Sequence, residues 1–164
     1  ELVYEGYGPS GVAVIVEAAT DNKNRTAGDV RHYFDKFGGN LGQTGCVGFL
    51  FSQKGVIIIS ENDEYGDKVV DGDKLMEDAL ECGAADFAEE EGYYEIYTEP
   101  DDLSAVCEDL EKKGYKFESA EVAKVPSTYV SLESEDDKKM MNLLIENLEE
   151  NDDIVNVWHN WDEN

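Results

Sequence analysis

The residues best suited to chemistry are basic, and they lie in and just before one predicted helix near the start of the chain. At about 100° per helical residue, Arg25, His32 and Lys36 point away from the apolar side of this helix. Cationic side chains beside the free N–H groups of a helix start can hold phosphate. The alternative is an ordinary solvated face, on which acidic side chains balance the bases. The candidate nucleic-acid-binding residues are Lys23, Asn24, Arg25, Arg31, His32 and Lys36.

Two glycine-rich stretches, residues 6–11 and 37–42, do not fit a phosphate-binding loop. Such a loop needs a strand, then the glycines, then a helix N-terminus whose N–H groups point at the anion. The first stretch instead precedes a predicted strand, and the second follows a predicted helix. Both are better explained as turns that require a positive φ.

Metal-binding and catalytic patterns are also missing from the sequence. The segment that starts at Glu61 faintly resembles a calcium loop, but its twelfth position, where a ligand is required, is Gly72. Three widely spaced cysteines exclude a disulfide framework and a CxxC-type metal site. No local signature marks a catalytic Cys–His or Ser–His pair. We therefore predict no enzymatic activity, no catalytic residues, no metal site and no cofactor.

The charge of the chain is strongly negative and unevenly spread. The sequence has 39 acidic and 13 basic side chains, a net charge of −26. Residues 1–56 contribute a net charge of only −1, so the other 108 residues carry −25. Phosphate backbones are repelled by such a surface, which limits any nucleic-acid contact to the first third or to a part outside this chain. The acidic remainder either solubilises the protein or meets a basic protein partner.

No apolar run approaches the roughly 20 residues that a membrane-spanning helix needs. We also find no leader pattern at the start of the chain. The sequence therefore predicts a cytoplasmic protein, or a mitochondrial one if the chain is eukaryotic, without a membrane partner.

Hydrophobic periodicity predicts an alternation of strands and helices. Strands are expected at Val12–Thr20, Val47–Phe51, Val56–Ser60, Ala84–Ala88, Tyr93–Thr98, Phe117–Lys124, Tyr129–Leu132 and Ile154–Trp158. Helices are expected at about 26–37 with Thr26 and Asp29 as a capping pair, at 72–82, from Pro100 to Gly114, and after Ser134 with Asp137 as its capping partner. At least one of Trp158 and Trp161 is expected in a core.

This order predicts an α+β fold with two ferredoxin-like (split βαβ) domains, one inserted into the other. Residues 54–124 read β-α-β-β-α-β, and the flanking pieces, 1–53 and 125–164, read as the same unit split open. A single mixed sheet is the competing arrangement.

Several landmark segments together resemble the YebC/PmpR family. They are Tyr4–Pro9, Asp21–Thr26, Val30–His32, Gly38–Gly42 and Val155–Asn160. The resemblance implies a basic N-terminal helical domain, absent from this chain, followed by two α/β domains of which the third is inserted in the second. On this reading, residues 1–53 with 125–164 form the second domain, and residues 54–124 form the third.

The resemblance supports two functions. Family members are described as DNA-binding transcriptional regulators. A mitochondrial branch is a translational activator for a cytochrome oxidase subunit, and bacterial relatives are linked to ribosomes stalled on proline-rich chains. The expected partners are therefore DNA or ribosomal RNA, bound mainly through the absent N-terminal domain, with a possible basic protein partner for the acidic inserted domain. A net charge of −16 on residues 57–124 favours the ribosome, whereas the family descriptions favour DNA.

Overall fold

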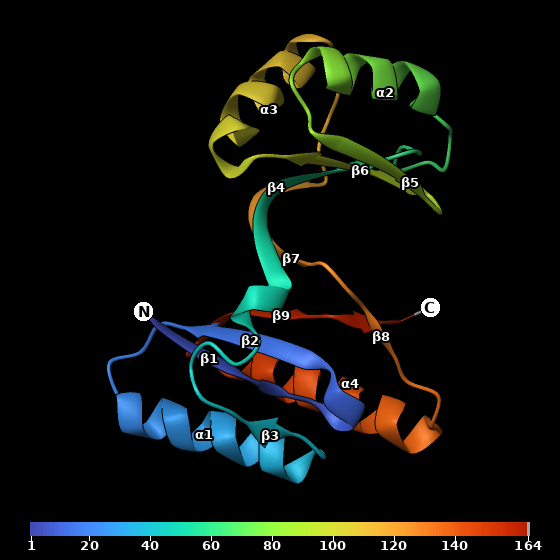
Figure 1. The fold of residues 1–164 in the computed structure, drawn as a ribbon. Helices are drawn as coiled ribbons and strands as arrows, with labels where there is room; N and C mark the ends of the chain where they lie inside the picture. Colours follow the sequence, from blue (N-terminus) through green and yellow to red (C-terminus); the bar gives the residue numbers. More distant parts are fainter. Residues whose placement is uncertain (164) are drawn as a thin grey trace. The chain divides into compact units, whose positions relative to one another are not determined.

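The computed structural model describes residues 1–163, which form two compact units. Unit 1 consists of residues 1–52 and 125–164, and unit 2 consists of residues 53–124. Each unit has its own antiparallel sheet and two α-helices within the described residues (Figure 1). The predicted α+β class is therefore confirmed. None of the helices in residues 1–163 is long and apolar enough to cross a membrane.

Unit 2 has the β-α-β-β-α-β order that the sequence predicted. Its elements are β4 (Phe51–Ser60), α2 (Gly72–Glu81), β5 (Asp86–Glu90), β6 (Tyr93–Thr98), α3 (Leu103–Lys112) and β7 (Ser119–Pro126). The strands lie in the order β5-β6-β4-β7, which is the ferredoxin-like arrangement. Alternate residues of β4 and β6 face the two helices, because successive side chains of a strand point to opposite faces. The buried core of unit 2 is formed by Ile57, Ile59, Val70, Leu75, Ala79, Tyr94, Ile96, Val106 and Leu110.

Unit 1 combines a four-stranded sheet, a two-stranded sheet and two helices. Its elements are β1 (Leu2–Tyr7), β2 (Ala13–Ala18), α1 (Lys23–Lys36), β3 (Asn40–Leu41), β8 (Val130–Ser131), α4 (Glu135–Glu150), β9 (Ile154–His159) and β10 (Trp161–Asp162). The main sheet has the order β3-β1-β2-β9. Because β2 and β3 are both antiparallel to β1, the β2-α1-β3 segment is itself a split βαβ.

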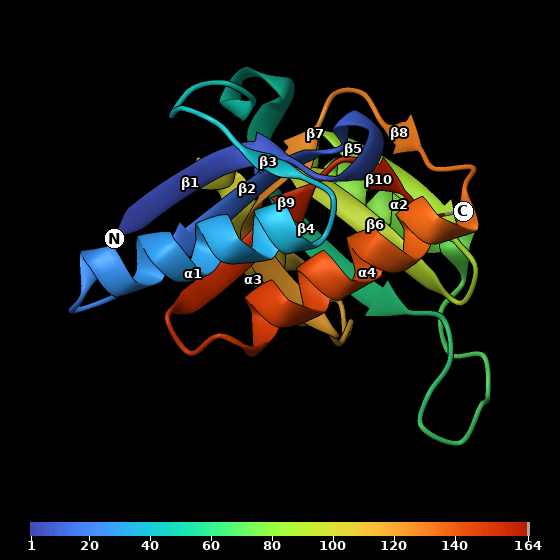
Figure 2. The ribbon, with the colours of Figure 1, turned by 90° about the horizontal axis from the view of Figure 1, so that it is seen from below.

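Helices α1 and α4 lie side by side on one face of the main sheet of unit 1 (Figure 2). Val14 and Val16 of β2 point to this face and pack with Phe34 of α1 and Leu144 of α4. Trp161 is also buried in this core, as the sequence analysis expected for at least one tryptophan.

On the opposite face of this sheet, the buried carboxylate of Glu5 binds the loop that contains residues 45–48. Glu5 is 6% exposed, and its carboxylate accepts hydrogen bonds from the backbone N–H groups of Gly45, Val47 and Gly48. These bonds satisfy a charged group that would be costly to bury alone. They fix residues 45–48 over Ala13 and Ile15, so Val47 is fully buried.

Two predicted strands differ from the structure, and one strand was not predicted. Val47–Phe51 is not a strand: residues 48–50 form a 3₁₀ turn held down by Glu5, and β4 then continues through Gln53–Gly55 without a break because Gly55 pairs with Thr98. The main sheet instead gains β1, which the sequence analysis did not predict. Val130 and Ser131 pair with β10 in a separate two-stranded sheet rather than with the main sheet.

Candidate nucleic-acid interface

Helix α1 carries all six predicted site residues, and it begins earlier than predicted. Asn22, not the pair of Thr26 and Asp29, caps the helix: its side chain accepts a hydrogen bond from the N–H of Arg25 at 3.1 Å. Lys23, Asn24 and Arg25 therefore form the first helical turn instead of preceding it. The helix ends near Gly38, which has the positive φ of 81° that favours glycine.

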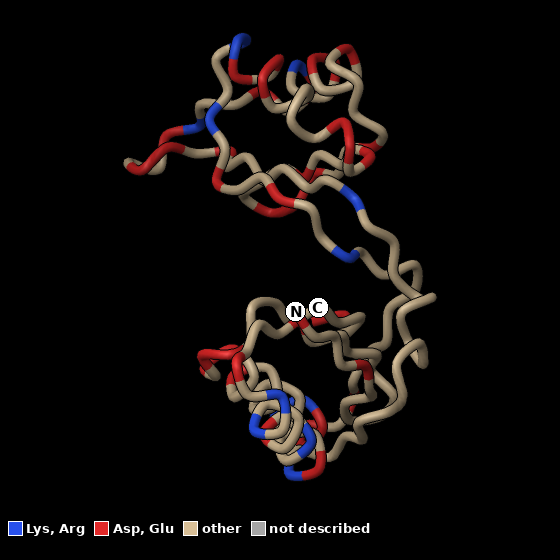
Figure 3. Tube along the Cα trace, turned by 90° about the vertical axis from the view of Figure 1, so that its left-hand side faces the viewer, with Lys and Arg blue, Asp and Glu red and all other residues tan. Residues whose placement is uncertain are grey.

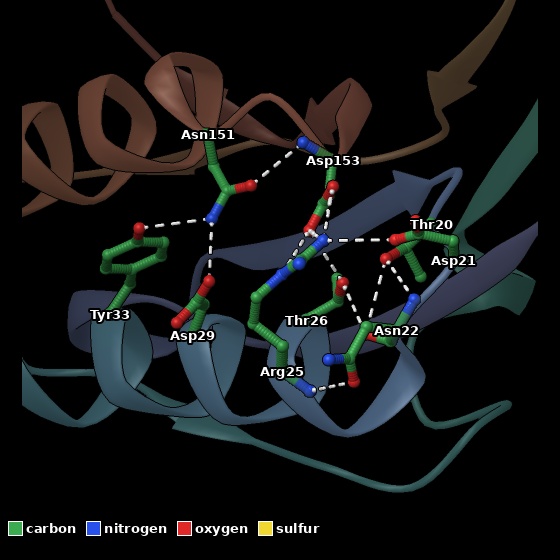
Figure 4. Close-up of polar contacts among 9 residues, drawn as sticks. All are labelled: Thr20, Asp21, Asn22, Arg25, Thr26, Asp29, Tyr33, Asn151 and Asp153. Carbon is green, nitrogen blue, oxygen red and sulfur yellow. Dashed lines mark hydrogen bonds and ion pairs between the residues drawn. The ribbon is translucent and has the colours of Figure 1, made fainter.

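Arg25 forms ion pairs within the protein, although 50% of its side chain remains exposed. Its guanidinium donates to Asp153 in the connection between α4 and β9, with an Nη2–Oδ2 distance of 3.0 Å, and it also lies 3.5 Å from Asp21 (Figure 4). The buried hydroxyl of Thr26 donates to the same carboxylate at 2.9 Å. The hydrogen bonds from Arg25 and Thr26 lower the pKa of Asp153, and the bonded carboxylate raises the pKa of Arg25.

The same contacts extend along α1 through an amide. The side-chain N–H₂ of Asn151 donates to Asp29 and to the hydroxyl of Tyr33, both at 3.2 Å, while its oxygen accepts from the backbone N–H of Asp153 (Figure 4). These bonds join the first three turns of α1 to the end of α4. Their role is structural: they hold α1 in place.

The other five predicted residues also occupy exposed positions of α1. Lys23, Asn24, Arg31, His32 and Lys36 are all exposed. Among the described residues, no acidic side chain forms an ion pair with Lys23, Arg31 or Lys36. The Lys36 ammonium lies 5.4 Å from the centre of the Phe37 ring, a separation compatible with a cation–π contact. We call these five residues the α1 basic face; at about 1.5 Å per residue it runs along roughly 20 Å of helix.

The charge around this face differs from that of unit 2. Unit 2 has 22 acidic and 7 basic side chains, a net charge of −15. Red acidic positions accordingly occupy much of its trace, and the blue positions of unit 1 lie on its two helices (Figure 3). Of the two units, only unit 1 offers a helix with more basic than acidic side chains. Among the described helices, α1 is therefore the one with a positive net charge.

Sequence reasoning missed the partners of Arg25. Asp153 is 128 positions away in the sequence, and no local pattern links the two residues. One signal was present: Thr26 puts a hydroxyl on the apolar side of α1, where a buried polar group needs a partner. Within residues 1–163, no group of three or more His, Cys, Asp or Glu side chains could hold a metal ion.

Comparison with known proteins identifies the family. The family model described as "TACO1/YebC second and third domain" matches residues 1–161. The chain belongs to the TACO1/YebC family. The resemblance to YebC/PmpR proteins that its landmark segments indicated is thereby confirmed.

Curated relatives in this family are named for gene regulation. A protein of Acetivibrio thermocellus named "probable transcriptional regulatory protein" is 58% identical over 161 residues, which are 98% of this chain and 64% of that protein. A protein of Clostridioides difficile with the same description is 55% identical, over 98% of this chain and 65% of that protein. The chain thus spans slightly less than two thirds of the length of these relatives.

A solved member of the family has the same fold. The crystal structure of a conserved hypothetical protein from Aquifex aeolicus superposes with a TM-score of 0.86 at 43% identity, covering 99% of this chain and 64% of that one. The fold described above is therefore that of a known TACO1/YebC-type structure.

Proposed function

We propose that this chain is part of a DNA-binding transcriptional regulator and that the α1 basic face is one of its contacts with nucleic acid. The observation that carries the proposal is the set of exposed cations Lys23, Arg31 and Lys36, which form no ion pair with an acidic side chain of the described residues. A group of cations without ion pairs is unexpected in a chain whose net charge is −26. The names of the relatives support regulation of transcription.

Each residue of the α1 basic face has a distinct role in this proposal. Arg31 can donate two parallel N–H bonds to one phosphate, and the lysines act as point charges. Asn24 and His32 add further side-chain N–H donors. Contacts of this kind position a protein on a nucleic acid without reading its sequence. Arg25 contributes indirectly, because its ion pair with Asp153 fixes the first turn of α1.

The second candidate is a ribosome-associated translation factor, and it is favoured by the charge of unit 2. A net charge of −15 on 72 residues opposes the approach of bare DNA. A ribosome offers both RNA phosphates and basic proteins, so it can satisfy the α1 basic face and unit 2 together. The relatives' names favour the first candidate, and the charge of unit 2 favours the second.

Two binding assays on the full-length protein separate the candidates. Gel shift with competitor-challenged DNA and co-sedimentation with purified ribosomes are run at about 150 mM salt, where weak phosphate attraction is screened. A sequence-selective DNA shift without ribosome binding supports the transcriptional regulator. Ribosome co-sedimentation without a selective shift overturns it in favour of the translation factor.

The double variant Arg31→Ala with Lys36→Ala then tests the α1 basic face in whichever assay gives binding. The matched control is Lys112→Ala with Lys116→Ala, which removes two exposed positive charges from unit 2. Weaker binding of the first variant alone supports the proposed contact. Equal binding of all three proteins would remove α1 from the interface.

A further inference from the structure

One face of the sheet in unit 2 carries no helix. Both α2 and α3 pack on the face that bears Ile57, Ile59 and Ile96 (Figure 1). The register pairs Val56 with Tyr97, and Ser60 with Tyr93. Because side chains alternate along a strand, these residues all point to the other face.

Two tyrosines make this face aromatic at its centre. Tyr93 and Tyr97 both lie on β6, which with β4 forms the middle of the sheet. Tyr93 is 37% exposed, and Tyr97 is half-buried with its hydroxyl donating to Glu95. Val56 and Ile58 of β4 lie beside them and are also half-buried. A flat group could stack on such a surface.

Three carboxylates share the face with the tyrosines. Asp86 and Glu90 of β5 stand opposite Tyr97 and Tyr93, and Glu95 lies between the two tyrosines on β6. In the described part of the chain, none of the three carboxylates forms an ion pair. The acidic side chains also affect their neighbour: partial burial, together with the negative charges of Glu95 and Glu90, raises the pKa of Tyr93.

This combination favours a flat cation over a nucleic acid. Aromatic residues on the two central strands of a β-α-β-β-α-β sheet can stack bases in RNA-binding domains. Here, however, the three carboxylates would repel the phosphates that accompany the bases. An arginine guanidinium avoids this conflict, because it stacks on a tyrosine ring and forms bidentate hydrogen bonds with a carboxylate.

We propose that this face, formed by Asp86, Glu90, Tyr93, Glu95 and Tyr97 and called the tyrosine–carboxylate face, binds an arginine-rich segment of another protein. The charge of unit 2 supports the same occupant, since a net charge of −15 attracts a basic chain from a distance. This proposal uses no residue of the α1 basic face. Its test is therefore independent of the test of the nucleic-acid contact.

Fluorescence anisotropy tests the proposal with the 164-residue chain. The probe is a short fluorescein-labelled peptide of alternating arginine and glycine, titrated with protein at about 150 mM salt. The test variant is Glu90→Gln with Glu95→Gln. The control is Glu108→Gln with Glu111→Gln, which removes the same two charges from exposed positions of α3, on the opposite side of the sheet. A third variant, Tyr93→Leu, removes the aromatic ring, and circular dichroism checks that each variant is folded.

We expect the wild-type chain to bind the peptide and the test variant to bind it about three- to tenfold more weakly, as for the loss of two partly exposed ion pairs. The control should change the affinity less than twofold, and Tyr93→Leu should also weaken binding. If the test and control variants weaken peptide binding equally, the peptide is attracted only by the overall negative charge of the chain, and the proposal is overturned. Absence of peptide binding, or competition at this face by a single-stranded RNA oligonucleotide, would overturn it too.

Discussion

At the residue scale, Arg25 shows that a predicted binding residue can instead form ion pairs within the protein. Sequence reasoning placed it in a phosphate site because it is a cation at a helix start. In the structure its guanidinium is bound to Asp153 and Asp21. No sequence pattern joins residues 25 and 153, so only the tertiary structure could show that Arg25 is paired with acidic side chains. Arg31 and Lys36 are exposed as well, without an ion pair among the described residues.

The pH dependence of stability should reveal this ion pair. Because Arg25 and Thr26 lower the pKa of Asp153 in the folded chain, the stabilisation is complete above the ordinary aspartate pKa of about 4 and is lost as the pH falls through the lower folded value. We expect Asp153→Asn to lower the Tm by a few degrees at pH 7, and the difference from wild type to shrink below about pH 4. Thermal scans monitored by circular dichroism at several pH values measure this difference in Tm.

Asp152→Asn is the control for this measurement. It removes the same charge from the exposed neighbour of Asp153. We expect it to leave the Tm nearly unchanged at every pH. A Tm difference for Asp153→Asn that stays constant down to pH 2 would contradict a role for the ionised carboxylate.

At the element scale, helices and central strands were predictable, whereas strand partners were not. The apolar stripes of α1 and α4 follow the helical repeat, and Ser134 caps α4 as expected by accepting from the N–H of Asp137. The strand β1 was missed because its Gly6 begins the glycine-rich stretch 6–11, which suggested a turn. Gly6 is required there for a different reason: an added Cβ would collide with the carbonyl oxygen of Asn40 in the adjacent strand.

Two glycines near α1 should respond in opposite ways to alanine. Gly28 lies in the middle of the helix, and a Cβ added there would meet no atom within 4 Å. We expect Gly28→Ala to raise the free energy of unfolding by about 0.5–1 kcal/mol, because alanine loses less entropy in a helix. At Gly39 a Cβ would collide with the carbonyl oxygen of Tyr7. We therefore expect Gly39→Ala to lower the free energy of unfolding by about 1–3 kcal/mol.

Urea unfolding of the two glycine variants checks this prediction. The midpoint should rise for Gly28→Ala and fall for Gly39→Ala at similar m-values. A lower midpoint for Gly28→Ala would show that the exposed side of α1 is more crowded than the structure indicates.

At the scale of the whole molecule, the division into two units is the main structural feature. The sequence placed the boundaries at 53/54 and 124/125, and the compact units divide at 52/53 and 124/125. The assignment of these units to the family's second and third domains stays a prediction. The detailed strand pairing of unit 1 could not be foreseen, because β9 and β2 come together only after the whole of unit 2 has intervened in the sequence.

Unit 1 should fold after unit 2 is removed. The chain ends left by the deletion are already neighbours, since the N–H of Ser127 donates to the carbonyl of Leu50 at 2.9 Å. We expect a chain with residues 53–124 replaced by a short Gly/Ser linker to keep α1, α4 and the main sheet, and to unfold cooperatively. Circular dichroism and thermal unfolding measure this, and an unfolded product would contradict the independence of unit 1.

The central claim is that the α1 basic face contacts nucleic-acid phosphate, and salt dependence tests it most directly. In the full-length protein, log affinity for duplex DNA is measured against log salt for wild type, for Arg31→Ala with Lys36→Ala, and for the control Lys112→Ala with Lys116→Ala. Each lost phosphate contact reduces the slope by about 0.9, so we predict a slope shallower by about 1–2 for the α1 variant alone. An unchanged slope for the α1 variant would contradict the claim.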